Sequence, residues 1–239
     1  MIPWLDRNAP FPPTHTALKD PNGLLAAGGD LSPDRLILAY RHGIFPWYTE
    51  GDPILWWSPD PRMVLFPQEL KISRSLAKTL RNRQYQIRYD TAFDQVMARC
   101  AKPRSNQSGT WITGEMSDAY ARLHRLGYAH SVETWMEGQL AGGLYGVALH
   151  PVFFGESMFS RERDASKIAL DSLVRLLRHR GYALIDCQMH TGHLASLGAR
   201  DIPRERFSRL LSELIHYSPR PDGPWTPFRY VIEPLIRTA

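Results

Sequence analysis

The stretch VFFGESMFSRERDASKIALDSLVRLLRHRGYALIDCQM, residues 152–189, combines three patterns that decide the fold. Its opening VFFGESMF is typical of a strand, and the apolar run YALIDCQM at its end predicts a second one. Between them we expect a helix over residues 165–180, closed by Gly181. The apolar face of this helix contains Ile168, Leu173, Val174 and Leu177. A strand, a helix and a strand in this order predict a crossover connection within a mixed α/β sheet.

The residues upstream of this stretch alternate between helical and strand patterns. Helices are expected at roughly 73–82, 91–101 and 115–126. The segments HSVETWM and QLAGGLYGVAL flank the turn sequence EG and predict a β-hairpin. We therefore expect one α/β (α+β) domain over residues 68–239.

Residues 1–67 have a different texture, because they are crowded with Pro, Gly and Trp in segments such as PFPP, FPWY and WWSPDPR. Long regular elements do not tolerate so many prolines. One helix is clear, in SPDRLILAYRHG, with Ser32 as its N-cap, Pro33 at its first position and Gly43 at its end. These residues predict a small, irregular N-terminal domain.

The composition is that of a globular protein, with 239 residues of which 43% are hydrophobic. The N-terminus lacks the pattern of a signal peptide and no apolar run is long enough for a membrane span, so we expect a cytoplasmic protein without a membrane partner. Cys100 and Cys187 lie far apart in sequence and are expected to be reduced. We further expect a monomer. The net charge of +5 permits a polyanionic partner without requiring one.

Polar residues interrupt both strands of the opening stretch. If side chains alternate regularly, Asp186 and Gln188 share a face of one strand, and Glu156 shares a face with Met158 on the other. A buried carboxylate must be paired or must face a polar cavity. One interpretation is therefore that Glu156 and Asp186 open onto one cavity that holds a cation beside an apolar group. The alternative is a pair of core acids satisfied by nearby cations, namely Arg161, Arg163 or Lys167.

A metal site is a weaker hypothesis. Cys187, His190 and His193 follow a C-x2-H-x2-H pattern, but this spacing matches no standard zinc motif and a fourth ligand is missing. The sequence also lacks a nucleophile elbow, a P-loop and a dinucleotide-binding glycine motif. We expect no metal and no cofactor.

Aromatic and basic residues suggest contact with a nucleic acid. Four tryptophans fall in loops or at the edges of expected elements: Trp47, Trp56, Trp57 and Trp111. Such rings can stack on unpaired bases, or they can hold together a loop-rich domain, and for Trp56 and Trp57 both readings stay open. The cations Arg74, Lys78 and Arg81 share one face of the helix expected after Ser73. This face either contacts phosphates or is simply solvated.

Several longer segments together resemble the leucyl/phenylalanyl-tRNA protein transferases of bacteria. They span most of the chain from about residue 21 to 204: PNGLLAAGGDLSPDRLILAYRHGIFPWY, DPILWWSPDPRMVL, GTWIT, AYARLHRLGYAHSVE, GGLYGV, FFGESMFS, ASKIAL, LIDCQ and HLASLGARDIPR. The resemblance implies an aminoacyltransferase that moves Leu, Phe and less often Met from aminoacyl-tRNA to the N-terminal Arg or Lys of a protein, which creates a degradation signal. It also implies a small N-terminal domain packed on a C-terminal domain of the acetyltransferase-like (GNAT) fold.

The resemblance assigns roles to residues as well. Asp186 and Gln188 match the family's catalytic pair, and Glu156 matches its neighbouring acidic residue. It implies that Trp47 and Trp111 contact the terminal adenosine of the tRNA. The donor side chain is expected in an apolar pocket that includes Met158 and Leu170, and Arg74, Lys78 and Arg81 are expected to contact the tRNA backbone.

Two other functions compete with this one. A cell-wall peptide ligase of similar fold would also use aminoacyl-tRNA, but the specific segments disfavour it. A non-catalytic RNA-binding module would explain the cations and tryptophans, but it leaves Glu156, Asp186 and Gln188 without a purpose.

Overall fold

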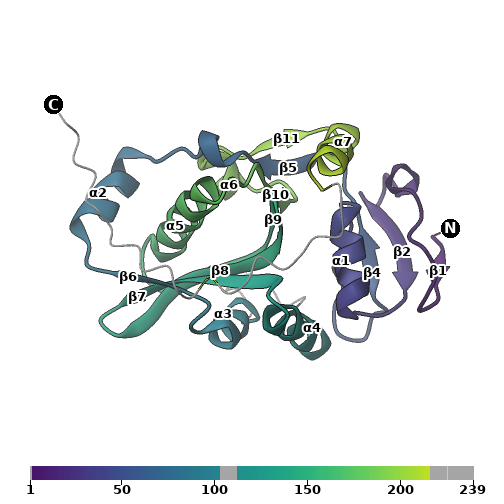
Figure 1. The fold of residues 1–239 in the computed structure, drawn as a ribbon, viewed down its shortest axis with the longest axis horizontal. Coiled ribbons are helices and arrows are strands. Elements are labelled where there is room, and N and C mark those ends of the chain that lie inside the picture. The colour runs from purple at the N-terminus through teal and green to yellow at the C-terminus, as the bar shows by residue number, and fades with distance from the viewer. Residues whose placement is uncertain (1, 103–111, 216–224, 226–239) are drawn as a thin grey trace.

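The computed structural model describes residues 2–102, 112–215 and 225 of the chain. The N-terminal part forms a small mixed sheet in the order β1-β2-β4-β3, covered by one helix, and lies at one end of the molecule (Figure 1). We call the residues that precede β5 the N-terminal unit. Its elements are β1 (Trp4–Leu5), a 3-10 turn (Thr14–Thr16), β2 (Leu24–Gly28), α1 (Pro33–Arg41), β3 (Phe45–Pro46) and β4 (Leu55–Trp57).

The rest of the described chain builds a seven-stranded sheet in the order β11-β5-β10-β9-β8-β7-β6. Its strands are β5 (Arg62–Leu65), β6 (Gln86–Tyr89), β7 (Ala129–Met136), β8 (Gln139–Leu149), β9 (Val152–Ser160), β10 (Leu184–Gln188) and β11 (Arg200–Ile202). The helices are a 3-10 turn (Pro67–Glu69), α2 (Arg74–Asn82), α3 (Phe93–Cys100), α4 (Gly114–Arg125), α5 (Ala165–His179), α6 (Gly192–Ser196) and α7 (Arg204–Leu214).

The strand connections confirm the mixed α/β class. Strands β9 and β10 are parallel and are joined by α5, while β7, β8 and β9 form an antiparallel meander. The hairpin turn between β7 and β8 consists of Glu137 and Gly138, which both have positive φ, at 50° and 74°. Two positive φ values match the twist that a two-residue hairpin turn requires. The helices expected at 73–82, 91–101, 115–126 and 165–180 are also confirmed within two residues at each end.

Strand β5 lies in the middle of the larger sheet, between β10 and β11. The expected division at residue 67 assigns this strand to the N-terminal unit. The pairing shows instead that the chain enters the larger sheet at Arg62. A strand of four residues in the Pro-rich region gives little periodic signal, so its partners were not evident from the sequence.

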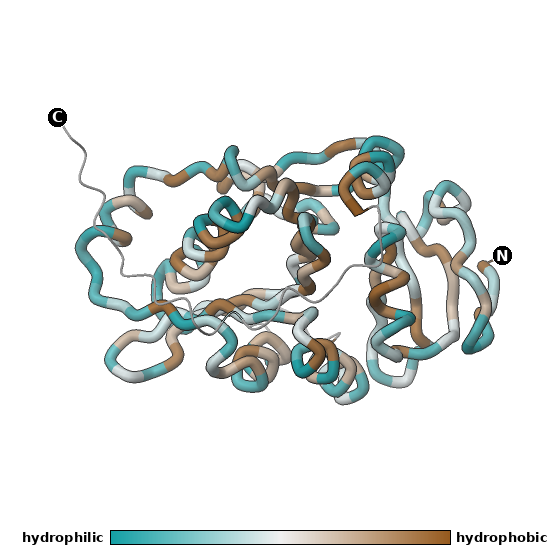
Figure 2. The backbone as a smooth tube through the Cα atoms, in the orientation of Figure 1, coloured by the Kyte–Doolittle hydropathy of each residue, from teal (hydrophilic) through white to brown (hydrophobic). Residues whose placement is uncertain are grey.

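The two larger hydrophobic cores among the described residues lie on opposite faces of the larger sheet. One lies between the sheet and α5 and contains Leu170, Leu173 and Ile185. The other includes residues of α1, α3, α4, α7 and both sheets, so it runs through the junction of the N-terminal unit with the rest. Figure 1 shows α5 on one side of β7 and β8 and α3 and α4 on the other, and Figure 2 shows the alternation of hydrophobic and hydrophilic residues along α5.

Cys100 and Cys187 are free thiols, both half-buried. Burial raises the pKa of the Cys187 thiol, which keeps this group neutral. Within the described residues, we find no helix with the length and apolar character needed to cross a lipid bilayer.

Candidate functional site

Strands β9 and β10 separate part-way along their length. They pair only where Val152–Phe154 lie beside Leu184–Asp186. Beyond this point β9 bulges at Glu156, which has no register partner on β8, and β10 bulges at Cys187, which has none on β5. Bulges bend a strand and change the direction of the side chains that follow. Glu156 and Gln188 therefore lie where the two strands have diverged.

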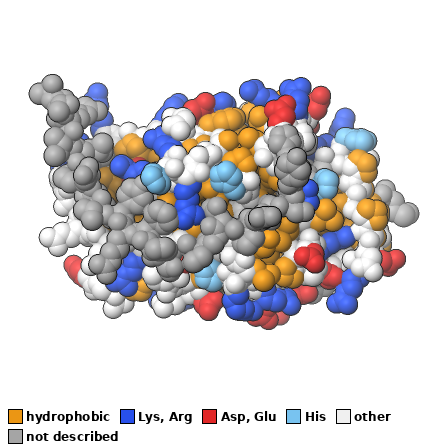
Figure 3. Space-filling model, in the orientation of Figure 1, with side chains coloured by type: hydrophobic (Ala, Val, Ile, Leu, Met, Phe, Trp, Pro, Cys, Tyr) orange, Lys and Arg blue, Asp and Glu red, His pale blue; other side chains and the backbone are white. Residues whose placement is uncertain are grey.

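A cavity of about 470 Å³ opens at this divergence. Its apolar lining comes from the sheet, from the helices α5 and α6 and from the N-terminal unit: Phe45, Pro46, Trp47, Leu144, Phe153, Met158, Phe159, Leu170, Leu173, Ile185 and Leu194. Polar groups, among them Glu156, Gln188, Ser166 and His193, line the remainder. Figure 3 shows hydrophobic side chains at the surface near the centre of one face of the molecule. An apolar cavity with a few convergent polar groups is the usual form of a ligand site.

Glu156 is the acidic group of this cavity. Its Oε1 accepts hydrogen bonds from Tyr40 at 2.8 Å and from Nε2 of Gln188 at 2.9 Å, and its Oε2 accepts one from Tyr120 at 2.9 Å. The two tyrosine hydroxyls also lie within hydrogen-bonding distance of each other. Burial raises the pKa of Glu156 to about 7; the hydrogen bonds from the two tyrosines act in the opposite direction. This carboxyl group therefore changes charge near neutral pH.

The N-terminal unit supplies part of the site. Tyr40 comes from α1, whereas Tyr120 comes from α4 and Glu156 from β9. Phe45 and Trp47 of the same unit line the cavity. The site thus lies at the junction of the two sheets, and sequence reasoning missed both tyrosines because nothing in the helical pattern distinguishes them from core aromatics.

The expectation that Asp186 opens onto the cavity is wrong. Its side chain is fully buried and forms a bidentate ion pair with Arg62. Nε of Arg62 donates to Oδ1 of Asp186 at 2.8 Å, and Nη2 of Arg62 donates to Oδ2 at 2.6 Å. Oδ1 also accepts a hydrogen bond from the backbone N–H of Gln188 at 2.9 Å. Of the two readings of this carboxylate, paired or facing a cavity, the structure shows the first.

Arg62 is the partner that sequence reasoning missed. The sequence predicts a partner among Arg161, Arg163 and Lys167, but Arg62 comes from β5, which pairs directly with β10. The guanidinium is fully buried, donates to the carbonyl oxygen of Gly43 at 3.0 Å and lies between two aromatic rings. These rings are Phe45 at 4.8 Å and Phe207 at 4.7 Å. An arginine within the apolar run PRMVL was the signal, because two opposite charges in separate apolar runs predict a pair.

The backbone turns at Gln188. Its φ is 64°, in the left-handed region that a residue with a side chain rarely adopts. The N–H bond to Asp186 stabilises this conformation, and the side chain reaches Glu156. The side chain of Asp186 is thus linked to the backbone N–H of Gln188 and not to its side-chain amide.

Because of the bulge at Glu156, the expected orientation of Met158, on the same face of β9 as Phe154, is wrong. Regular alternation puts Phe154, Glu156 and Met158 on one face, but Met158 packs against the core under α5 while Phe154 belongs to the core on the other side. An extra residue shifts the alternation by one position. Because of this shift, Met158 lines the cavity together with Leu170.

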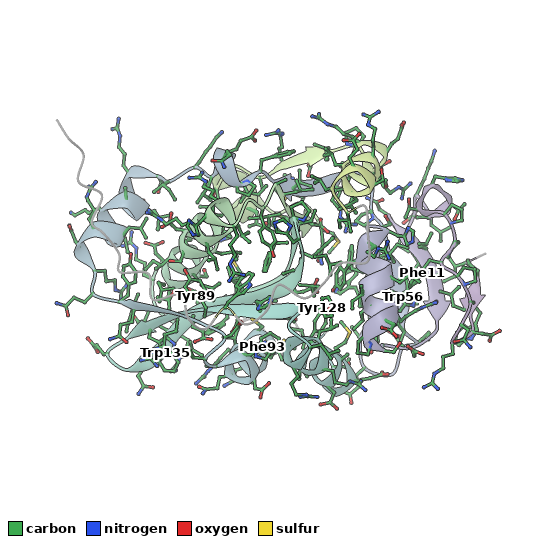
Figure 4. All side chains as sticks on the ribbon, viewed as in Figure 1. Phe11, Trp56, Tyr89, Phe93, Tyr128 and Trp135 are labelled. Carbon is green, nitrogen blue, oxygen red and sulfur yellow. The ribbon has the colours of Figure 1, made fainter. Side chains whose placement is uncertain are left out.

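The tryptophans divide between core and cavity. Trp56 and Trp57 are buried in β4, which favours the interpretation that both hold the loop-rich domain together. Trp56 packs edge-on against Phe11, with the ring centres 4.8 Å apart (Figure 4). Trp47 is half-buried, lines the cavity and meets Trp57 edge-on at 5.3 Å. Trp111 lies outside the described residues.

The cations Arg74, Lys78 and Arg81 are all exposed on α2. The end of α2 is attached to the turn between β9 and α5: Thr79 donates to Asp164 at 3.2 Å and Arg83 donates to Glu162 at 2.8 Å. This turn leads directly into Ser166, which lines the cavity. The cationic helix therefore lies next to the β9–α5 end of the site.

No group of three His, Cys, Asp or Glu side chains that could hold a metal ion occurs among the residues that the structure describes. Cys187 and His193 both line the cavity, but His190 is instead paired with Asp201 at 2.9 Å.

Two family models match the sequence. The model described as leucyl/phenylalanyl-tRNA protein transferase matches residues 64–212, and the one described as the N-terminal domain of that transferase matches residues 29–60.

Curated relatives carry the same description. A leucyl/phenylalanyl-tRNA protein transferase of Nitrosospira multiformis is 66% identical over 92% of this chain and 95% of its own length. The transferase of Chromobacterium violaceum is 62% identical over 94% of this chain and 96% of its own length. Among solved structures, a GCN5-related N-acetyltransferase from Kribbella flavida has 10% identity and a TM-score of 0.35, covering 71% of this chain and 60% of that chain.

Proposed function

Because the chain belongs to the leucyl/phenylalanyl-tRNA protein transferase family and is an aminoacyltransferase, we propose that it moves leucine, phenylalanine and less often methionine from their tRNAs to proteins that begin with Arg or Lys. The transfer marks the acceptor for degradation. The reaction takes place in the cytoplasm and requires no cofactor, since the aminoacyl ester is already activated.

The observation that carries the proposal is an apolar cavity with a carboxyl and an amide group at its edge. The donor side chain enters the apolar part, beside Met158 and Leu170. Such a pocket discriminates by about 1–3 kcal/mol per methylene, so leucine, phenylalanine and methionine are accepted to different extents. The selectivity is relative and not absolute.

The bond-forming step needs little assistance. The α-amine of the acceptor attacks the ester carbonyl carbon, a C–N bond forms, and the C–O bond to the terminal ribose breaks. An α-amine has a pKa near 8, so part of it is neutral at physiological pH. The proton that the amine loses balances the one that the departing ribose oxygen gains.

The polar residues divide this work. The side-chain amide of Gln188 orients the amine but is too weak a base to deprotonate it. Glu156 accepts three hydrogen bonds from the described residues, two on Oε1 and one on Oε2. Oε2 can therefore accept one more, from the cationic N-terminal residue of the protein that receives the amino acid. Asp186 is a positioning residue in this scheme, because it fixes the backbone of Gln188 through Oδ1.

The tRNA contacts two regions. Trp47 and Trp111 stack on its terminal adenosine, each for about 1–3 kcal/mol. Arg74, Lys78 and Arg81 contact its phosphate backbone away from that end, in keeping with their exposure on α2. The protein acts as a monomer.

The test is the incubation of the protein with labelled leucyl-tRNA and a peptide that begins with Arg. Label is expected in the peptide, and a peptide of the same sequence that begins with acetylated Arg serves as the control because it lacks the nucleophile. Gln188→Ala is expected to reduce transfer while leaving the fold intact. Absence of label with the wild-type protein would argue against the proposal and would favour an RNA-binding protein without this activity.

A further inference from the structure

Trp225, from the C-terminal part of the chain, inserts its side chain into the folded domain. Its side chain is fully buried and its indole ring stacks on the imidazole of His130, with the ring centres 4.1 Å apart and the planes 2° apart. Its backbone N–H donates to Oδ2 of Asp90 at 3.0 Å, and the guanidinium of Arg180 lies 5.5 Å from the ring centre. These contacts hold the indole on the α5 side of the larger sheet.

Phe153 lies between Trp225 and the cavity. Its ring centre is 5.9 Å from that of Trp225, and the ring also lines the cavity. A Cβ atom at Gly146 would come within 2.6 Å of the Phe153 ring, so this ring lies directly on the Gly146 backbone. Gly146 is the register partner of His130. The order along this layer is therefore Trp225 and His130, then Phe153 over Gly146, then the cavity.

We infer that Trp225 sets the depth of the donor pocket by supporting Phe153 from behind, an inference that rests on the proposed function of the cavity. Without the indole, the space behind Phe153 is vacant and its ring can withdraw from the cavity, because interiors relax partly into a void. The cavity then becomes deeper for long or aromatic donor side chains. Trp225 is a positioning residue that determines specificity without touching the donor.

Toward the described residues, the indole of Trp225 contributes the bulk of its ring and no hydrogen bond. The indole N–H of Trp225 is buried and has no hydrogen-bond partner among the described residues. A buried Tyr or Trp usually satisfies its polar atom. A smaller aromatic residue at 225 would therefore lose packing against Phe153 without losing a polar contact to the part of the chain that the structure describes.

The experiment measures binding of three amide-linked aminoacyl-adenosine analogues, which carry leucine, phenylalanine and 2-naphthylalanine, to the full-length protein by calorimetry. With Trp225→Ala the ratio of naphthylalanyl to leucyl affinity is expected to rise about tenfold, the lower end of what one methylene is worth in an apolar pocket. Trp225→Phe is expected to raise the same ratio less. The phenylalanyl analogue should shift in the same direction by an intermediate factor.

The matched control is Trp135→Ala. Trp135 is half-buried on β7, packs on Arg88 at 4.4 Å and lies at the end of the larger sheet that is far from the N-terminal unit (Figure 4). Its loss removes a tryptophan without affecting the wall of the cavity, so the affinity ratio should equal that of the wild type. Thermal unfolding of each variant shows whether it is folded at the assay temperature.

An affinity ratio that stays at the wild-type value in folded Trp225→Ala would overturn the inference. If that variant does not fold, Trp225→Phe decides in the same way. The outcome is separate from the proposed function, which is tested by leucine transfer in the wild-type protein, because analogue binding does not require transfer. A shifted ratio supports the role of Trp225 even if no transfer is found.

Discussion

Glu156 is a carboxyl group whose surroundings favour its protonated form. Burial raises its pKa from the ordinary value of 4.5 to about 7, so the folded protein binds the proton more tightly than the unfolded chain does. The free energy of unfolding that this group contributes is therefore highest at low pH and falls as the pH rises from 4.5 to about 7.

We predict that Glu156→Gln removes this dependence. Relative to the variant, the wild-type protein should lose up to about 3 kcal/mol of unfolding free energy between pH 5 and pH 8, because one pKa unit is worth about 1.4 kcal/mol. The measurement is urea unfolding of both proteins across this range. The difference between the two proteins cancels the contribution of other titrating groups. A difference that does not vary with pH would show that Glu156 titrates normally.

The ion pair of Arg62 and Asp186 lends itself to a second prediction at the level of single residues. Asp186→Ala leaves the buried Arg62 guanidinium without a counter-charge, which should lower the unfolding free energy by about 3–5 kcal/mol. Replacing both residues, as in Arg62→Met with Asp186→Leu, should recover most of that loss. Transfer should not recover, since the backbone of Gln188 still lacks its acceptor.

The readouts are urea unfolding and the kcat for transfer from a minimal aminoacyl-adenosine donor. Asp186→Asn is the conservative control, because its Oδ1 can still accept the N–H of Gln188. It should keep more activity than Asp186→Ala at equal folded fraction. Full activity in the double variant would contradict a positioning role for Asp186.

At the level of elements, the helices and the hairpin were predictable because their periodicity and turn residues are local. The bulges at Glu156 and Cys187 were not, because a single extra residue leaves the apolar pattern of β9 and β10 intact. They shape the site nevertheless: the bulge at Glu156 turns Met158 into the cavity. Residue types pointed to Glu156 and Gln188, but only the pairing of β5 with β10 reveals Arg62 as the partner of Asp186.

The exposed cations of α2 are expected to contact the phosphate backbone of the tRNA. Replacing Arg74, Lys78 and Arg81 with Ala should flatten the slope of log affinity against log salt by roughly 0.7 to 0.9 per cation, because fewer counterions are released. Leucyl-tRNA and phenylalanyl-tRNA should be affected alike. Turnover of a minimal adenosine donor should change little.

The matched control replaces Arg122 and Arg125, exposed cations of α4 that lie on the opposite side of the larger sheet from α5. The slope lost per cation should be smaller in this control. An equal loss per cation in both variants would mean that only net charge matters, and α2 would then be an ordinary solvated surface.

For the molecule as a whole, one core continues from the N-terminal unit into the larger sheet. Leu36 and Tyr40 of α1 belong to the same core as Phe154 and Phe207. A shared core couples the two parts, so we predict a single thermal unfolding transition in which the calorimetric and van't Hoff enthalpies agree. Two resolved transitions would show that the N-terminal unit is stable by itself.

A fragment experiment sharpens the same point. A chain that begins at residue 68 lacks β5, so β10 and β11 lose the strand between them and the fragment should not fold. A chain that begins at residue 61 keeps β5 but exposes the core that α1 covers. It should be less stable than the full-length protein yet retain the sheet, as measured by circular dichroism.

The position of β5 has a consequence for biosynthesis. Its four residues leave the ribosome early, but its two neighbours, β10 and β11, begin at Leu184 and Arg200. Contacts between residues so distant along the chain form late and slow folding. Until then Arg62 is a cation in an apolar segment that awaits Asp186, more than a hundred residues later. The nascent chain thus carries β5 unpaired for about half of its translation, and in this interval the strand is accessible to a chaperone that binds extended segments.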